Sequence, residues 1–125
     1  MKLSILIYDE DRQQRIKTAH IIMQVYKEDN CDIDLYSFDD PEKAMACASD
    51  GAIETAFISM EDKYGRGFYL AKKLKNLDPQ INLISMAKEL RFGHELINLR
   101  ISGYILGDRT KEKIVDELDN LLREI

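Results

Sequence analysis

Five short runs of apolar residues divide the chain, and apolar residues recur at helical spacing in the segments between them. The runs have the length of strands and alternate little with polar residues, which is typical of strands buried on both faces of a parallel sheet. They predict strands at residues 3–8, 33–38, 53–59, 81–86 and 103–106. The intervening segments predict amphipathic helices at about residues 12–27, 41–50, 68–77, 89–100 and 111–125.

Capping residues support several of these helix boundaries. Asp40 and Pro41 suit the N-cap and the first helical position, and Thr110 suits the N-cap of the last helix. The last helix has the clearest apolar period, which runs to Ile125. The helix over residues 89–100 is the weakest prediction, because Gly93 within it costs roughly 1 kcal/mol relative to Ala.

The regular alternation of strand and helix predicts a parallel sheet with helices on both faces, joined by right-handed crossovers. The length of 125 residues suits one domain. We therefore expect a three-layer, flavodoxin-like (βα)5 fold over residues 1–125, with strand order 2-1-3-4-5. In this order the first and third strands are neighbours, so Asp9, Glu10 and Ser59 should meet at the carboxyl edge of the sheet, where such folds bind ligands.

The bulk composition restricts the classes of function. Eighteen basic and 23 acidic residues give a formal net charge of −5, which weakens any claim that this chain itself binds nucleic acid. The first apolar run is too short for a signal peptide and is followed by acids, and no run approaches the roughly 20 residues that span a bilayer. We expect a cytoplasmic protein without membrane contact. Cys31 and Cys47 have no metal-ligand neighbours and are expected to be buried, inert thiols.

The acidic pair after the first strand has two interpretations. Asp9 and Glu10 supply the oxygen ligands that Mg²⁺ prefers, and they equally suit a solvated turn at a helix start. Their spacing does not decide between a weak Mg²⁺ site and a structural turn.

Over essentially its whole length the chain resembles a response-regulator receiver domain. Asp9-Glu10 resembles the acidic pair of that family, and residues 53–59, followed by Gly67, resemble its phosphoacceptor strand and loop. Residues 70–79 and 103–106 are most similar to the LytTR-type (LytR/AlgR-like) subgroup, in which a DNA-binding domain usually follows the receiver. The resemblance implies two-component signal transduction and transcription regulation, with DNA bound by a separate effector domain outside this chain.

The chain departs from that family at the phosphoacceptor. Ser59 stands where the family has the phosphorylated aspartate, so there is no carboxylate to form an acyl phosphate. A serine hydroxyl is a weak nucleophile unless a base activates it, and His20 and His94 lie in helices away from the strand ends. The missing carboxylate also weakens Mg²⁺ binding, although the Glu61 backbone would still offer a carbonyl ligand and Asp62 a nearby carboxylate.

The parts that sense the phosphoryl group are altered as well. Met86 and Ala87 fall where the family has Ser or Thr, with Ser85 one residue earlier, and Gly107 falls where it has the lysine of a Lys-Pro pair. Tyr104 occupies the position of the family's switch aromatic, and it suits a half-exposed core position equally well.

Two other cationic residues of the chain could take the place of the missing lysine. Arg109 or Lys88 would have to approach the site to replace it, which nothing in the sequence requires.

These departures favour a degenerate receiver, a pseudo-receiver that is not an enzyme. It would act through protein contacts, as a homodimer through the surface of the fourth helix, fifth strand and fifth helix, or with a signalling protein. Two alternatives remain. The chain could be phosphorylated at a non-standard residue, namely Ser59, Glu61 or Asp62. It could also be a small flavodoxin-like enzyme or nucleotide-binding domain, against which the lack of a glycine-rich loop after the first strand argues.

Overall fold

The computed structural model describes residues 2–123, in which five strands and five helices alternate. The elements are β1 (Leu3–Tyr8), α1 (Arg12–Glu28), β2 (Ile33–Phe38), α2 (Pro41–Asp50), β3 (Thr55–Ser59), α3 (Arg66–Leu77), β4 (Asn82–Ala87), α4 (Gly93–Asn98), β5 (Gly103–Leu106) and α5 (Lys111–Arg123). All five strands are parallel, in the order β2-β1-β3-β4-β5, which confirms the predicted flavodoxin-like architecture.

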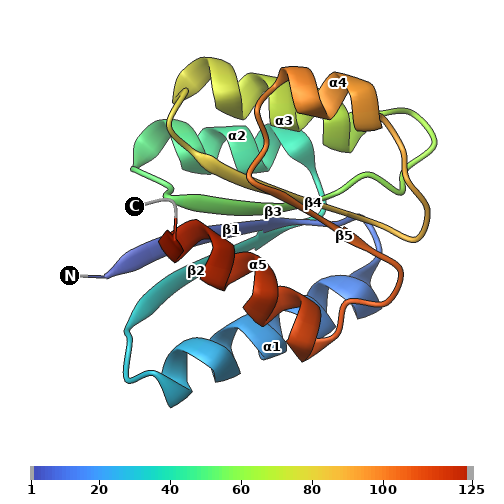
Figure 1. Cartoon of the computed structure of the whole chain (residues 1–125). Helices are drawn as coiled ribbons and strands as arrows, with labels where there is room; N and C mark the ends of the chain where they lie inside the picture. The colour runs from blue at the N-terminus through green and yellow to red at the C-terminus, as the bar shows by residue number, and fades with distance from the viewer. Residues whose placement is uncertain (1, 124–125) are drawn as a thin grey trace.

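Helices cover both faces of the sheet, with α1 and α5 on one side and α2, α3 and α4 on the other (Figure 1). Because side chains alternate across a strand, each strand supplies both cores. Ile5, Ile7 and Phe57 pack toward α1 and α5. Leu6 and Ile58 pack toward α2, α3 and α4. β3 lies at the centre of the sheet and is buried along its whole length, as its continuous apolar run predicted.

The structure corrects the predicted fourth helix. α4 spans Gly93–Asn98 and is shorter than the predicted 89–100. Phe92 has a left-handed backbone with φ 56°, so the chain turns there and Gly93 begins the helix instead of interrupting it. Arg100, with φ 59°, lies beyond its other end. Both positive φ values are incompatible with a continuous α-helix.

Several other boundaries shift by one or two residues. β3 begins at Thr55, and β4 runs one residue later than predicted. Asp40 takes the N-cap position of α2 without a capping hydrogen bond from its side chain. Thr110 does cap α5, since its hydroxyl accepts the N–H of Lys113 at 3.2 Å. The predicted end of that helix at Ile125 lies outside the described residues.

The cysteine prediction was wrong about burial. Cys31 and Cys47 are free thiols that are each only half-buried. Partial burial raises the pKa of the Cys47 thiol, which keeps it in the less reactive protonated form. Within residues 2–123, none of the helices has the length and apolar character that crossing a membrane requires.

Candidate functional site

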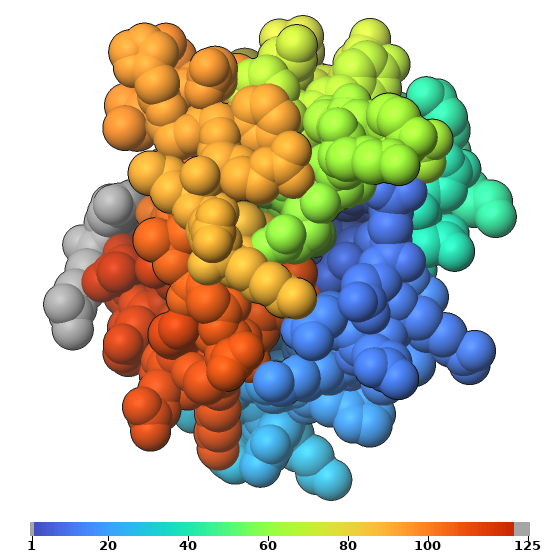
Figure 2. All heavy atoms as spheres, turned by 90° about the vertical axis from the view of Figure 1, so that its right-hand side faces the viewer, coloured from blue at the N-terminus to red at the C-terminus, as the bar shows by residue number. Residues whose placement is uncertain are grey.

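The carboxyl ends of β1 and β3 meet as predicted and bring Asp9, Glu10 and Ser59 together. They line a cavity of about 190 Å³ together with Tyr8, Asp11, Glu61 and Asp62. Figure 2 faces this edge, where the blue segment after β1 meets the green segment after β3 and the orange segments after β4 and β5. A second cavity of about 110 Å³ extends from Asp9 toward the β5–α5 turn.

Asp9 is paired with a buried arginine from the far end of the chain. The Arg109 guanidinium forms an ion pair with the Asp9 carboxylate, and the two side chains are 6% and 3% exposed. The same Nη1 atom lies 3.4 Å from the Thr18 hydroxyl of α1. The other Asp9 carboxylate oxygen accepts the N–H of Asp11 at 2.9 Å. Because a buried charge is tolerated when it is paired and hydrogen-bonded, Arg109 acts as an internal counter-ion for Asp9.

Glu10 has a different arginine as its partner. Arg66 Nη1, from the start of α3, lies 2.9 Å from Glu10 Oε1 in a largely exposed ion pair. Next to it, the Tyr8 hydroxyl is buried and has no hydrogen-bond partner among the described residues. Burial, reinforced by the negative charges of Glu10 and Asp62, raises the pKa of Tyr8. The Tyr8 hydroxyl therefore stays protonated and contributes no charge to the cavity.

Ser59 has a structural role at the end of β3. Its hydroxyl is almost fully buried, and Oγ accepts the N–H of Glu61 at 3.2 Å, which stabilises the turn out of the strand. The backbone also explains Gly67: a Cβ atom there would lie 1.9 Å from the carbonyl oxygen of Ser59. The chain's two histidines, His20 and His94, are exposed on α1 and α4, so no imidazole base faces Ser59.

The acids after Ser59 also bond to backbone groups. The Glu61 carboxylate accepts the N–H of Lys88, which joins the β3–α3 loop to the end of β4. The Asp62 carboxylate accepts three N–H groups, those of Tyr64 at 3.1 Å, Arg66 at 2.8 Å and Gly67 at 3.1 Å. Both carboxylates are therefore committed to shaping the loop and the first turn of α3.

These contacts do not fit a magnesium site. Mg²⁺ requires several oxygen ligands in near-octahedral geometry. Here Asp9 and Glu10 are each engaged by an arginine, and across residues 2–123 no group of three His, Cys, Asp or Glu side chains is placed to hold a metal ion. The sequence offers Arg109 as a cation near the site but gives no sign of its pairing with Asp9, because the two residues lie 100 positions apart.

The residues at the family's phosphoryl-sensing positions lie at the carboxyl ends of β4 and β5. Ser85, Met86 and Ala87 are buried. Met86 packs into the α1–α5 core, whereas Ala87 faces the α2–α4 side. Gly107, with φ 79°, donates its N–H to the carbonyl of Ala87 at 2.9 Å. At the end of β4, Ala87 therefore places a methyl group beside the cavity, at the position where the resemblance to receivers led us to look for a hydroxyl.

Tyr104 and Arg91 hold the neighbouring loops together. The Tyr104 hydroxyl donates to the Arg91 carbonyl and accepts the Arg91 N–H, both at 3.1 Å. Arg91 Nη1 in turn donates to the carbonyls of Met60 at 2.8 Å and Asp62 at 3.1 Å. The half-buried Tyr104 thus anchors the β4–α4 loop, which Arg91 connects to the β3–α3 loop. The sequence carried no signal for this connection, because Arg91 lies in a segment that was predicted to be helical.

No family model and no curated protein matches the sequence. The structure is similar to a CheY-like response regulator receiver domain protein from Methanospirillum hungatei, with a TM-score of 0.79, 16% identity and coverage of 99% of this chain and 96% of that one. Chemotaxis protein CheY4 of Vibrio cholerae has a TM-score of 0.78 at 13% identity, with complete coverage of both chains. A two-component response regulator from Clostridium difficile has a TM-score of 0.79 at 18% identity, covering 98% of this chain and 97% of that one. At these identities the likeness establishes the fold, and the chain has the (βα)5 fold of CheY-like receiver domains.

Proposed function

We propose that this chain is a pseudo-receiver, a signalling domain of a cytoplasmic LytTR-type regulator that works through protein contacts without aspartyl phosphorylation and without catalysis. DNA would be bound by a separate effector domain. The observation that carries the proposal is the buried Arg109–Asp9 ion pair beside a serine at the end of β3. Asp9 in the acidic pocket is paired with the protein's own Arg109, and the acceptor position offers a hydroxyl in place of a carboxylate.

The chemistry of the pocket supports this proposal. A hydroxyl nucleophile needs a base to remove its proton, and within residues 2–123 no group accepts a hydrogen bond from the Ser59 hydroxyl, whose Oγ accepts the N–H of Glu61. Phosphorylation at Glu61 or Asp62 would first break the hydrogen bonds that hold these carboxylates to the loop backbone. The geometry thus favours the pseudo-receiver over a receiver that is phosphorylated at a non-standard residue.

The surface formed by α4, β5 and α5 is the proposed contact site. Ile97 of α4 is 73% exposed and Leu106 of β5 is 45% exposed, and Leu90 of the loop before α4 is 64% exposed. Exposed apolar side chains mark protein–protein interfaces where they form a continuous patch. A second copy of the chain, or a signalling partner, would bury them.

Incubation with Mg²⁺ and acetyl phosphate tests the phosphorylation part of the proposal. The intact mass should remain unchanged, while a phosphorylatable receiver treated in parallel gains one phosphoryl group. A phosphoryl adduct on this chain would refute the proposal, and its loss in a Ser59→Ala, Glu61→Gln or Asp62→Asn variant would identify the acceptor.

Analytical ultracentrifugation tests the contact surface. The Ile97→Glu substitution should shift a dimer toward monomer, whereas Met23→Glu, which alters a similarly exposed apolar residue on α1, should leave the association unchanged. A dimer that Ile97→Glu does not weaken would place the contact elsewhere.

A further inference from the structure

α3 and the loop before it concentrate positive charge in an otherwise acidic protein. Residues 63–77 contain five of the eighteen basic residues and no acidic residue, although the whole chain has a formal net charge of −5. Lys75 is half-buried and donates to the carbonyls of Pro79 and Ile81, so it has a structural role. The other four basic residues are exposed, and together with two exposed tyrosines they form what we call the basic surface: Lys63, Tyr64, Arg66, Tyr69, Lys72 and Lys73.

Aromatic rings hold these cations in place. Lys63 and Arg66 lie 5.1 and 5.4 Å from the centroid of Tyr64. Lys72 lies 5.0 Å from Phe68, and Lys73 lies 5.3 Å from Tyr69. All four contacts lie within the β3–α3 loop and α3, and each places a cation within about 6 Å of a ring centroid, the range of cation–π attraction. Each contact restricts a long, flexible side chain, which lowers the entropy lost when that side chain binds a partner.

Phe68 also stacks on Phe92 of the β4–α4 loop, with ring centroids 4.8 Å apart and planes 5° apart. Because Arg91 connects that loop to the carbonyls of Met60 and Asp62, the base of the basic surface is tied to two loops. α3, which carries Lys72 and Lys73, is therefore held to the β4–α4 loop by Phe68, and Arg91 connects that loop to the β3–α3 loop.

A solvated helix face does not account for this arrangement. Exposed helices are commonly stabilised by opposite charges at i,i+4, and like charges on one face repel. The surface of α5 mixes both signs of charge, with Lys113 followed by Asp116 at i+3 and Glu117 at i+4. The exposed face of α3 has no acid to offset Lys72 and Lys73. Neither lysine has an acidic partner within 4.0 Å among the described residues.

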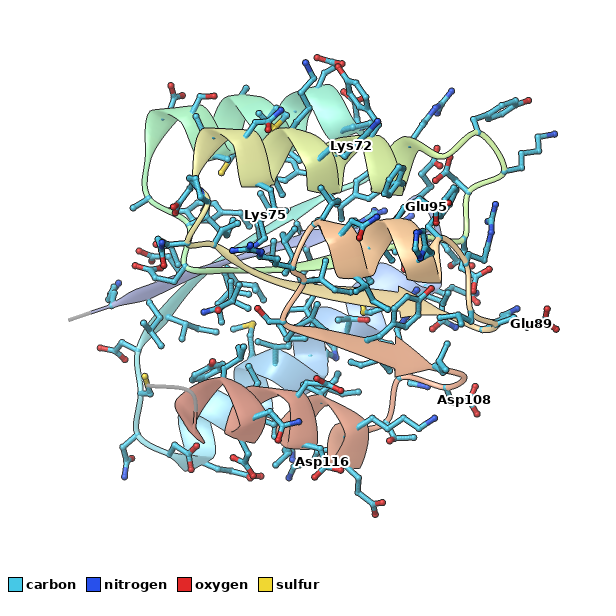
Figure 3. The ribbon with its side chains drawn as sticks, turned by 45° about the horizontal axis from the view of Figure 1, so that its top comes forward. Lys72, Lys75, Glu89, Glu95, Asp108 and Asp116 are labelled. Carbon is cyan, nitrogen blue, oxygen red and sulfur yellow. The ribbon has the colours of Figure 1, made fainter. Side chains whose placement is uncertain are left out.

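The limits of the positive area indicate the kind of partner. Figure 3 shows Lys72 and Lys75 on α3, whereas the labelled acids belong to the β4–α4 loop, α4, the β5–α5 turn and α5. A long polyanion that extended past α3 toward these elements would meet the carboxylates of Glu89 and Glu95. The twelve residues of α3 span about 18 Å, which matches about six residues of extended peptide. Exposed tyrosines beside cations also suit a protein ligand, since Tyr and Arg are enriched at the energetic centres of protein interfaces.

We propose that the basic surface binds an acidic segment of a partner protein, with carboxylates on Lys63, Lys72 and Lys73 and apolar side chains on Tyr64 and Tyr69, while Arg66 keeps its ion pair with Glu10. Binding there needs neither the acidic pocket nor the α4–β5–α5 surface. It can therefore succeed or fail independently of the proposed function.

Fluorescence anisotropy with the whole chain tests this proposal. The probe is a labelled peptide of about eight residues that alternates Glu and Leu, which is long enough to cover α3 and the loop residues before it. The peptide should bind, and the affinity should fall as the ionic strength rises from about 0.05 to about 0.15 M, because the contacts are exposed ion pairs. The double variant Lys72→Glu/Lys73→Glu should weaken binding by about tenfold or more, equivalent to about 1.4 kcal/mol.

A matched control separates this surface from overall charge. Lys17→Glu/Lys27→Glu makes the same change in net charge at two exposed positions of α1 and should leave peptide affinity within about twofold. Tyr69→Ala should weaken binding without changing the net charge. Equal losses in the two double variants, or no peptide binding at the lower ionic strength, would overturn the proposal. Tighter binding of an oligothymidylate or of phosphatidylserine vesicles than of the peptide would overturn it in favour of nucleic acid or membrane.

Discussion

The Arg109–Asp9 ion pair predicts a large and specific loss of stability when one partner is removed. Arg109→Met keeps much of the side-chain volume and removes the charge, which leaves the Asp9 carboxylate buried with a single backbone N–H as its remaining donor. Breaking a buried pair in this way costs about 3–5 kcal/mol. Since domains of this kind have unfolding free energies of about 5–15 kcal/mol, the variant should lose a large share of its stability.

Urea unfolding followed by circular dichroism measures this loss. The control is Arg66→Met, which makes the same substitution in the ion pair with Glu10. Those side chains are 51% and 33% exposed, so the expected cost is about 0–1 kcal/mol. Adding Asp9→Asn to Arg109→Met should recover stability, because the uncompensated charge disappears. A loss below about 1 kcal/mol for Arg109→Met, or no recovery in the double variant, would show that Arg109 is not the counter-ion of Asp9.

Three further substitutions test other contacts. Gly67→Ala should destabilise the fold by about 1–3 kcal/mol in urea unfolding, because the added methyl group would overlap the Ser59 carbonyl oxygen, whereas Gly51→Ala, which meets no atom within 4 Å, should be close to neutral. Tyr104→Phe should cost about 1–3 kcal/mol and speed hydrogen exchange at Arg91, because both of its backbone hydrogen bonds are lost. Tyr8→Phe should be neutral or stabilising at pH 7, because the buried hydroxyl has no partner. Since the pKa of Tyr8 is raised in the folded state, wild-type stability should be full below the ordinary tyrosine value near 10 and fall above it, and Tyr8→Phe should reduce that alkaline loss.

The architecture was predictable because it depends on short-range patterns. The apolar runs of β1 and β3 and the helical spacing of α5 appear within a few residues, and general rules of handedness and connection then lead to the sheet order. The prediction failed over residues 89–100, where periodicity suggested a long helix. Phe92 has a left-handed backbone and its ring stacks on Phe68, a contact between distant segments that no local pattern reveals.

For the candidate site, the positions of the residues were predictable and their contacts were not. Its members from strand ends, Asp9, Glu10 and Ser59, followed from the predicted topology, since parallel strands end at one edge of the sheet. What those side chains do there did not follow. The pairing of Asp9 with Arg109 and the bond from Lys88 N–H to the Glu61 carboxylate join residues that are 100 and 27 positions apart.

By itself, then, the sequence determined the succession of strands and helices, the order of the sheet and the residue types at its carboxyl edge. The tertiary structure decided which charged side chains form ion pairs and which carboxylates are bound to backbone N–H groups. The physical reason is that backbone periodicity is a local property, whereas the state of a buried carboxylate depends on whichever cation the completed fold brings beside it, here Arg109 from the turn before the last helix.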